Sequence, residues 1–191
     1  MKNRIVLAAV ALGAFALDQS TKLLVQSSMA LGQSKPLLGD LVRLTYIFNP
    51  NGLKGISFGP WSRYLMLPLS LLAIAAIIYF YYHWQNPGTV SSAAMGLILA
   101  GAAGNLLDRF HYSTVIDFID CDIPDINVPA FRFLFLHFPG YHLERWYIFN
   151  VADSAVLVGV TLLLVITMLK DRRAAAPEMP AEQRTQPTAA P

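Results

Sequence analysis

The sequence contains a long internal stretch without a charged side chain. No Asp, Glu, Lys or Arg occurs between Arg63 and Asp108, and one bilayer-spanning helix needs only about 20 apolar residues. The stretch is therefore long enough for two such helices. Near its midpoint, His83 begins the segment HWQNPG, whose Asn-Pro-Gly sequence breaks a helix and favours a chain reversal. These features predict a helical hairpin embedded in a membrane.

Two further apolar runs, at residues 5–17 and 154–169, raise the number of predicted spans to four. The composition agrees, because only 14% of the residues are charged, against about 25% in ordinary soluble domains. We therefore predict a mainly α, polytopic membrane protein with one domain over residues 1–173 and a disordered tail over residues 174–191. The predicted spans lie at about residues 5–25, 64–84, 90–108 and 151–169.

The first apolar run also fits a segment of another class. Lys2 and Arg4, followed by apolar residues and the triplet Ala14-Phe15-Ala16, describe a cleavable signal peptide. Against this alternative, the apolar pattern continues past the triplet as far as Val25, and the polar residues there recur at helical spacing.

An even number of spans places both chain ends on one side of the membrane. The basic residues flanking the first and last spans favour the cytoplasm for both ends under the positive-inside rule; they are Lys2, Arg4, Lys170, Arg172 and Arg173. The segments then predicted outside the cytoplasm are residues 26–63 and 109–150. They also carry basic residues, and long loops obey the rule poorly.

Two segments outside the spans have the composition of β-strands. Residues 37–48 are rich in β-branched and aromatic side chains, and residues 131–138 repeat Phe with a period of two. Together they are predicted to form a small sheet on the outer membrane surface. In the third span, Ser92, Gly96, Ala100 and Gly104 recur every fourth residue and form a ridge that another helix can approach closely.

Ionisable groups at membrane depth are costly and point to function or to structural pairing. Asp18 and Lys22 are four residues apart, so they share a helix face and can form an ion pair near the interface. Asn105, Asp108 and Arg109 end the third span. They are interpreted either as a polar hinge that orients the following loop or as an internal Asp-Arg pair.

Asp117 follows the third predicted span, and Asp153 lies at the start of the fourth. In isolation, Asp117 would be a surface carboxylate and Asp153 an acid favoured by the positive end of a helix. The topology, however, brings both to the same membrane face. Two adjacent carboxyl groups share a proton, so that the ionised one can activate water while the protonated one donates to a peptide carbonyl.

Other catalytic chemistries lack support in the sequence. The four histidines are not spaced as HExxH, so no metal site is expected, and neither a GxSxG elbow nor a P-loop is present. The single cysteine, Cys121, excludes an intrachain disulfide. A net charge of +2 says little about partners, and we expect no cofactor and no nucleic acid.

Five motifs occur in an order and spacing that resemble lipoprotein signal peptidase (signal peptidase II). They are DQSTK at 18–22, GISFG at 55–59, GAAGNLLDR at 101–109, VIDF at 115–118 and FNVAD at 149–153. The resemblance implies a bacterial inner-membrane enzyme with four spans, both termini in the cytoplasm and a small extracytoplasmic β-cradle. It also implies an aspartic endopeptidase whose active site lies near the periplasmic face.

The resemblance also assigns roles to residues and names partners. It implies that Asp117 and Asp153 are the catalytic dyad, whereas Asp18 and Lys22 form a structural pair. The residues it assigns to substrate binding or to support of the site are Asn51, Asn105, Asp108, Arg109 and Asn150. The implied substrate is a prolipoprotein cleaved immediately before its diacylglyceryl-modified cysteine, in contact with membrane lipid. Globomycin is the expected inhibitor.

The sequence departs from the family pattern at two places. The segment NPNGLKGISFG at 49–59 leaves either Asn49 or Asn51 for the family's asparagine position. Residues 131–141 stand where a short loop is expected, and we interpret them as an interfacial insertion. Two other protein classes remain as alternatives: a small transporter with the acids on an ion path, and a non-catalytic assembly factor that uses the ridge of the third span as its interface.

Overall fold

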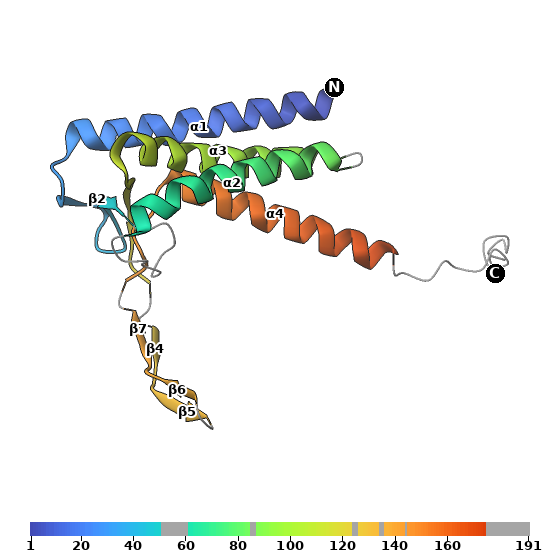
Figure 1. Ribbon diagram of the computed structural model, residues 1–191. Helices are drawn as coiled ribbons and strands as arrows, with labels where there is room; N and C mark the ends of the chain where they lie inside the picture. The colour runs from blue at the N-terminus through green and yellow to red at the C-terminus, as the bar shows by residue number, and fades with distance from the viewer. Residues whose placement is uncertain (51–60, 85–86, 124–125, 134–135, 144, 175–191) are drawn as a thin grey trace, which may run out of the picture.

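The computed structural model describes residues 1–50, 61–84, 87–123, 126–133, 136–143 and 145–174. Its helices are α1 (Lys2–Ser28), α2 (Ser62–His83), α3 (Thr89–Tyr112) and α4 (Val151–Ala174). All four contain a stretch long and apolar enough to cross a membrane, and they run side by side (Figure 1). The predicted polytopic fold with four spans is confirmed. The predicted disordered tail lies outside the described residues.

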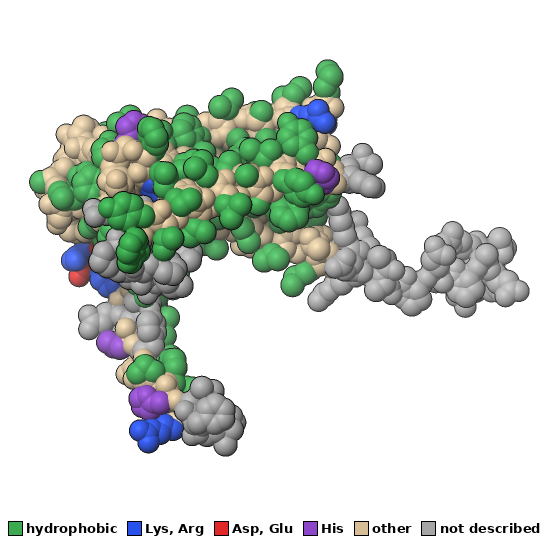
Figure 2. Space-filling view, in the orientation of Figure 1, with side chains coloured by type: hydrophobic (Ala, Val, Ile, Leu, Met, Phe, Trp, Pro, Cys, Tyr) green, Lys and Arg blue, Asp and Glu red, His purple; other side chains and the backbone are tan. Residues whose placement is uncertain are grey.

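The helices carry apolar side chains outward, as lipid requires. Leu24 of α1, Leu72 of α2 and Leu157 of α4 are each about two-thirds exposed, at 65%, 66% and 69%. Figure 2 shows such hydrophobic side chains spread over the helices on the viewed face. In water this surface would be costly, whereas in a bilayer it is the normal exterior of a helical bundle.

Helix α3 lies at the centre of the packing because its small residues admit two neighbours. A Cβ added to Gly96 would approach the Leu7 carbonyl oxygen of α1 at 2.7 Å, and one added to Gly104 would meet the Asp18 carboxylate of the same helix. A Cβ on Gly101 would meet the Ala152 carbonyl oxygen of α4. The predicted ridge therefore packs against α1, so its surface is already covered and is not free to bind a separate assembly partner.

The sheet next to the bundle is built differently from our prediction. Its strands are β1 (Ser34–Leu38), β2 (Val42–Asn49) and β3 (Val115–Cys121), in the order β1-β2-β3 and all antiparallel. The strand predicted over residues 37–48 is in fact two strands joined by a turn. The chain reverses at Gly39, whose φ of 57° is a conformation that suits glycine.

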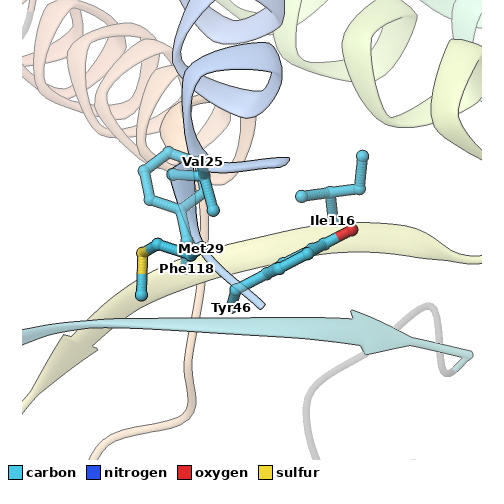
Figure 3. Packing of buried hydrophobic residues seen from close by; sticks show 5 residues of the cluster. All are labelled: Val25, Met29, Tyr46, Ile116 and Phe118. Carbon is cyan, nitrogen blue, oxygen red and sulfur yellow. The ribbon is translucent and has the colours of Figure 1, made fainter. Parts of the chain in front are cut away.

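One face of this sheet packs under the last turns of α1. Tyr46 of β2 and both Ile116 and Phe118 of β3 form a buried cluster with Val25 and Met29, as Figure 3 shows. Side chains alternate along a strand, so Asp117, between Ile116 and Phe118, faces the opposite side. The cluster thus fixes the strand that carries the first predicted catalytic residue.

Residues 131–138 do not join this sheet, so the prediction of one strand paired with residues 37–48 was wrong. They form a hairpin, β5 (Phe131–Phe133) with β6 (Leu136–Phe138). A second pair, β4 (Ile126–Val128) with β7 (Tyr141–Leu143), connects this hairpin to the rest of the chain. The insertion is a two-stranded arm that extends from the bundle (Figure 1), because its halves satisfy each other's backbone hydrogen bonds.

Candidate active site

Asp117 is buried on β3 and accepts hydrogen bonds from two side-chain amides. Its carboxylate is 1% exposed. Asn49, at the end of β2, donates from Nδ2 to Oδ2 at 2.8 Å, and Asn150 donates from Nδ2 to Oδ1 at 2.8 Å. Amide donors on both oxygens stabilise the ionised form of a carboxylate. The strand and its partners therefore hold Asp117 in one orientation.

Asn150 connects β3 to the first turn of α4. Its Oδ1 accepts the Asp153 backbone N–H at 2.8 Å, as an N-cap side chain does. Its Nδ2 lies 3.0 Å from Asn105 Oδ1, in addition to its bond to Asp117. Because the cap requires the oxygen to face the helix, the amide nitrogen must face the strand and α3. Asn150 is completely buried.

Asn105 of α3 completes the connection between the two predicted catalytic residues. Its Nδ2 donates to Asp153 Oδ1 at 2.9 Å, while its Oδ1 accepts from Asn150. Asp117 and Asp153, from different elements, therefore belong to one hydrogen-bonded network whose bridge is the pair of amides Asn105 and Asn150. We call this pair the amide bridge.

A buried cluster of three charges lies next to the amide bridge. Lys22 Nζ of α1 is 2.9 Å from Asp18 Oδ2 and 2.7 Å from Asp108 Oδ2 of α3, and it donates to Asn105 Oδ1 at 3.2 Å. Asp18 also accepts the Ala152 backbone N–H at 2.8 Å, and Asp108 accepts that of Ile116 at 3.1 Å. We call Asp18, Lys22 and Asp108 the ion cluster. It joins α1, α3, α4 and β3.

Arg109 connects the site to α2. Its Nη1 donates to Ser70 Oγ at 3.1 Å and to the Asn105 backbone carbonyl at 3.2 Å. Asp153, Asp108 and Asp117 all act electrostatically on its guanidinium. This positive group therefore offsets part of the negative charge that the carboxylates bring to the site.

The segment that enters α4 is attached to β3. Phe149 exchanges backbone hydrogen bonds with Ile119 at 2.7 and 3.0 Å. Arg145 donates from Nε to Asp120 Oδ1 at 3.1 Å and from Nη2 to the Asp40 carbonyl at 3.1 Å. The Asp120 hydrogen bond raises the pKa of Arg145, so this clamp keeps its charge. These contacts set the position from which Asn150 and Asp153 begin the helix.

The structure unites most of the residues singled out from the sequence and adds others. Asp117, Asp153, Asn105 and Asn150 form the network described above, and Asp108 pairs with Lys22. Asn51 lies outside the described residues, whereas Asn49 contacts Asp117 directly. Sequence reasoning missed Ser70 and the clamp of Arg145 on Asp120, because neither has a motif that distinguishes it from other polar residues. Among the described residues, no group of three or more His, Cys, Asp or Glu side chains is arranged to hold a metal ion.

Comparison with known proteins gives one consistent answer. The family model described as signal peptidase (SPase) II matches residues 10–169. A lipoprotein signal peptidase of Geobacter sulfurreducens is 34% identical over 172 residues, which cover 87% of this chain and 94% of the relative. Another, from Desulfitobacterium hafniense, is 32% identical over 162 residues, which cover 83% and 90%.

A solved structure described as a bacterial membrane enzyme has the same fold. It superposes with a TM-score of 0.69 at 26% sequence identity, and the match covers 90% of this chain and 92% of the other. The similarity therefore extends over nearly the whole of both chains.

Proposed function

The chain belongs to the signal peptidase II family, a family of membrane peptidases, and from this premise we propose that it removes signal peptides from prolipoproteins. Both relatives described above are lipoprotein signal peptidases. The substrate we propose is a prolipoprotein whose cysteine already carries diacylglycerol, and the bond cleaved is the one immediately before that cysteine. The diacylglycerol of the substrate holds the scissile bond at the membrane surface. A site at the end of a helical bundle lies at the same depth and can reach that bond.

The mechanism we propose rests on the amide bridge, which connects Asp117 with Asp153. We assign the ionised role to Asp117, because two amides donate to its oxygens. Asp117 then takes a proton from a water molecule, which attacks the scissile carbonyl. Asp153 is the protonated partner that donates its proton to the carbonyl oxygen. When the tetrahedral intermediate collapses, Asp117 passes the proton it took from water to the leaving amine, and the hydroxyl formed from the carbonyl oxygen returns a proton to Asp153. No covalent intermediate is required.

The surrounding polar residues are proposed to hold the dyad and the substrate. Asn105 and Asn150 position the two carboxyl groups through the amide bridge. Asp108 pairs with Lys22 in the ion cluster and accepts the Ile116 N–H, so it holds β3 in place beside the bridge. Arg109 contributes positive charge where negative charge develops on the peptide oxygen. Asn51 remains a predicted substrate-binding residue of the segment between β2 and α2, and Asn49 is proposed as the residue that holds Asp117.

An apolar groove among α2, α3 and α4 fits the hydrophobic part of a signal peptide. It has a volume of about 470 Å³ and is lined mainly by apolar side chains such as Phe80, Met95 and Leu163. It lies away from the sheet end of the bundle, so a substrate helix that runs from the site toward the opposite leaflet would pass over it. We propose that the signal peptide is held there by lipid-like contacts.

The same proposal fixes the orientation of the enzyme. We place it in the bacterial inner membrane with both termini in the cytoplasm and the active site near the periplasmic face. Globomycin is expected to inhibit cleavage by competing with the prolipoprotein.

The deciding experiment is a gel-shift cleavage assay with the full chain in detergent. A model prolipoprotein is presented with and without diacylglyceryl modification to the wild type, Asp117→Asn and Asp153→Asn. We expect cleavage of the lipidated form alone and its loss in both variants. Asp40→Asn is the matched control, since the Asp40 side chain is 71% exposed and pairs with Arg43. Substantial cleavage by a folded dyad variant would remove that residue from the mechanism.

A further inference from the structure

The arm, residues 126–143, contributes none of the hydrogen bonds described above for the active-site network. It leaves the bundle at the end where the sheet lies and runs across the direction of the helix axes (Figure 1). Its attachment includes the clamp of Arg145 on Asp120 and a backbone hydrogen bond from Trp146 to Cys121 at 3.1 Å. When the helices cross a membrane, an arm in this direction extends along the membrane surface.

The outer half of the arm has two chemically different faces. The register pairs Phe131 with Phe138 and Arg132 with His137. Directly paired residues share a face and successive residues alternate, so the two phenylalanines lie on one face and the two basic residues on the other. The phenylalanine rings stack with centroids 5.0 Å apart. They nevertheless remain 56% and 37% exposed.

The inner half repeats this division. Ile126 and Val128 are 41% and 37% exposed on one face, while Asn127 and His142 pair on the other. Residues 126–143 contain no Asp or Glu, but they contain Arg132, His137 and His142. Both halves of the arm are therefore amphipathic. Their polar faces carry no acidic side chain that would repel the phosphates of lipid headgroups.

The chemistry of the two faces favours one kind of partner, a lipid surface. Aromatic rings beside a cationic side chain such as Arg132 and polar imidazoles suit the boundary between lipid tails and headgroups. The arm also leaves the bundle at the sheet end, where the lipid-facing helices end (Figure 1). An exposed aromatic pair of this kind in water would favour aggregation.

We propose that the arm is an interfacial lipid-binding element of the leaflet at the sheet end of the bundle. Phe131 and Phe138 insert among the upper parts of the acyl chains, and Arg132 and His137 face the headgroup phosphates and water. The two faces of the arm and the membrane fold are sufficient for this placement, whichever substrate the enzyme cleaves.

The test places a fluorophore on each face of the arm. The full chain carries Cys121→Ser together with either Phe138→Cys or His137→Cys, is labelled with an environment-sensitive dye, and is inserted into lipid nanodiscs. Positions 137 and 138 are neighbours on opposite faces, so each is the control for the other. We expect spin-labelled lipid to quench the label at position 138 severalfold more strongly than that at 137. We expect aqueous iodide to give the reverse order.

Equal quenching by iodide at both positions, with none by the spin-labelled lipid, would show that the arm extends into water and would overturn the proposal. Efficient crosslinking of the unlabelled Phe138→Cys variant between copies would assign the apolar face to a second chain instead. If Phe138→Cys does not fold, Phe131→Cys and Arg132→Cys give the same comparison on the facing strand. Cleavage activity does not enter any of these measurements.

Discussion

The side-chain amide of Asn150 serves two elements at once. Its oxygen caps α4, and its nitrogen reaches Asn105 of α3 and Asp117 of β3. We expect Asn150→Ala to lower the free energy of unfolding by about 1 kcal/mol through loss of the cap, with a further loss from the unpaired buried acceptors. Cleavage should fall strongly, because the amide bridge that fixes Asp117 relative to Asp153 is then broken.

Thermal unfolding and initial cleavage rates of Asn150→Ala measure these two effects. The control is Asn127→Ala in the arm, where the side chain is exposed and should contribute to neither. If Asn150→Ala cleaved at the wild-type rate, the amide bridge would not position the dyad.

Lys22 provides the positive charge of the ion cluster at 1% exposure. Lys22→Met keeps the length of the side chain but leaves Asp18 and Asp108 buried without their cation. Breaking a buried ion pair in this way costs about 3–5 kcal/mol. Chemical unfolding in detergent should show this loss, whereas Lys35→Met, which removes an exposed lysine, should change stability little. Equal stabilities of the two variants would mean that the ion cluster does not stabilise the fold.

The cluster also shows what sequence spacing predicts well. Asp18 and Lys22 were expected to pair because they lie on one helix face, and they do so at 2.9 Å. The partnership of Lys22 with Asp108 was not predictable, since it depends on the rotation of α1 against α3. Similarly, the contact of Asn49 with Asp117 could be found only from the coordinates, because both Asn49 and Asn51 fit the motif.

At the scale of elements, the contact between α3 and α4 depends on Gly101. A Cβ at this position would collide with the Ala152 carbonyl oxygen, at the first turn of the helix that carries Asp153. We expect Gly101→Ala to destabilise the protein by about 1–3 kcal/mol through forced separation of the helices. Gly13→Ala is the matched control, because a Cβ there meets nothing within 4 Å and alanine favours a helix. Thermal unfolding of the two variants compares them, and similar melting temperatures would contradict this close contact.

The clamp of Arg145 holds the entry to α4 against β3. Arg145→Met should lower the cleavage rate more than it lowers stability, because Asp120 remains next to β2 while the segment before Asn150 gains freedom. Arg43→Met removes a surface ion pair with Asp40, which is worth about 0–1 kcal/mol, and is the control. Cleavage rates and melting temperatures of both variants test this, and a purely structural clamp would reduce stability and rate together.

The strands show why elements were predicted less accurately than spans. Hydrophobic and β-branched composition identified residues 37–48 and 131–138 as extended, which is correct locally. It did not reveal the turn at Gly39 or the partners of the strands. Pairing depends on which segments the helices bring together: β3 follows α3 directly and meets β2, whereas residues 131–138 pair within the arm.

For the whole molecule, hydropathy was sufficient to predict four spans because lipid permits few alternatives to apolar helices. Burial of Asp18 and Lys22 against α3 also argues against removal of α1 as a signal peptide, since Asp108 would lose its cation. The acids gather near the sheet end of the bundle rather than along the middle of the spans. This placement favours a surface reaction over an ion path.

Four spans and one site lead to a prediction about sidedness. Because α1 ends beside the sheet, residues near Ala30 should lie on the same face as the active site, and residues near Lys2 on the opposite face. With Cys121→Ser as background, Ala30→Cys should react with a membrane-impermeant maleimide in right-side-out vesicles. Lys2→Cys should react only in inside-out vesicles, and both should react in detergent. The reverse pattern would place the active site on the cytoplasmic side and would contradict the proposed orientation.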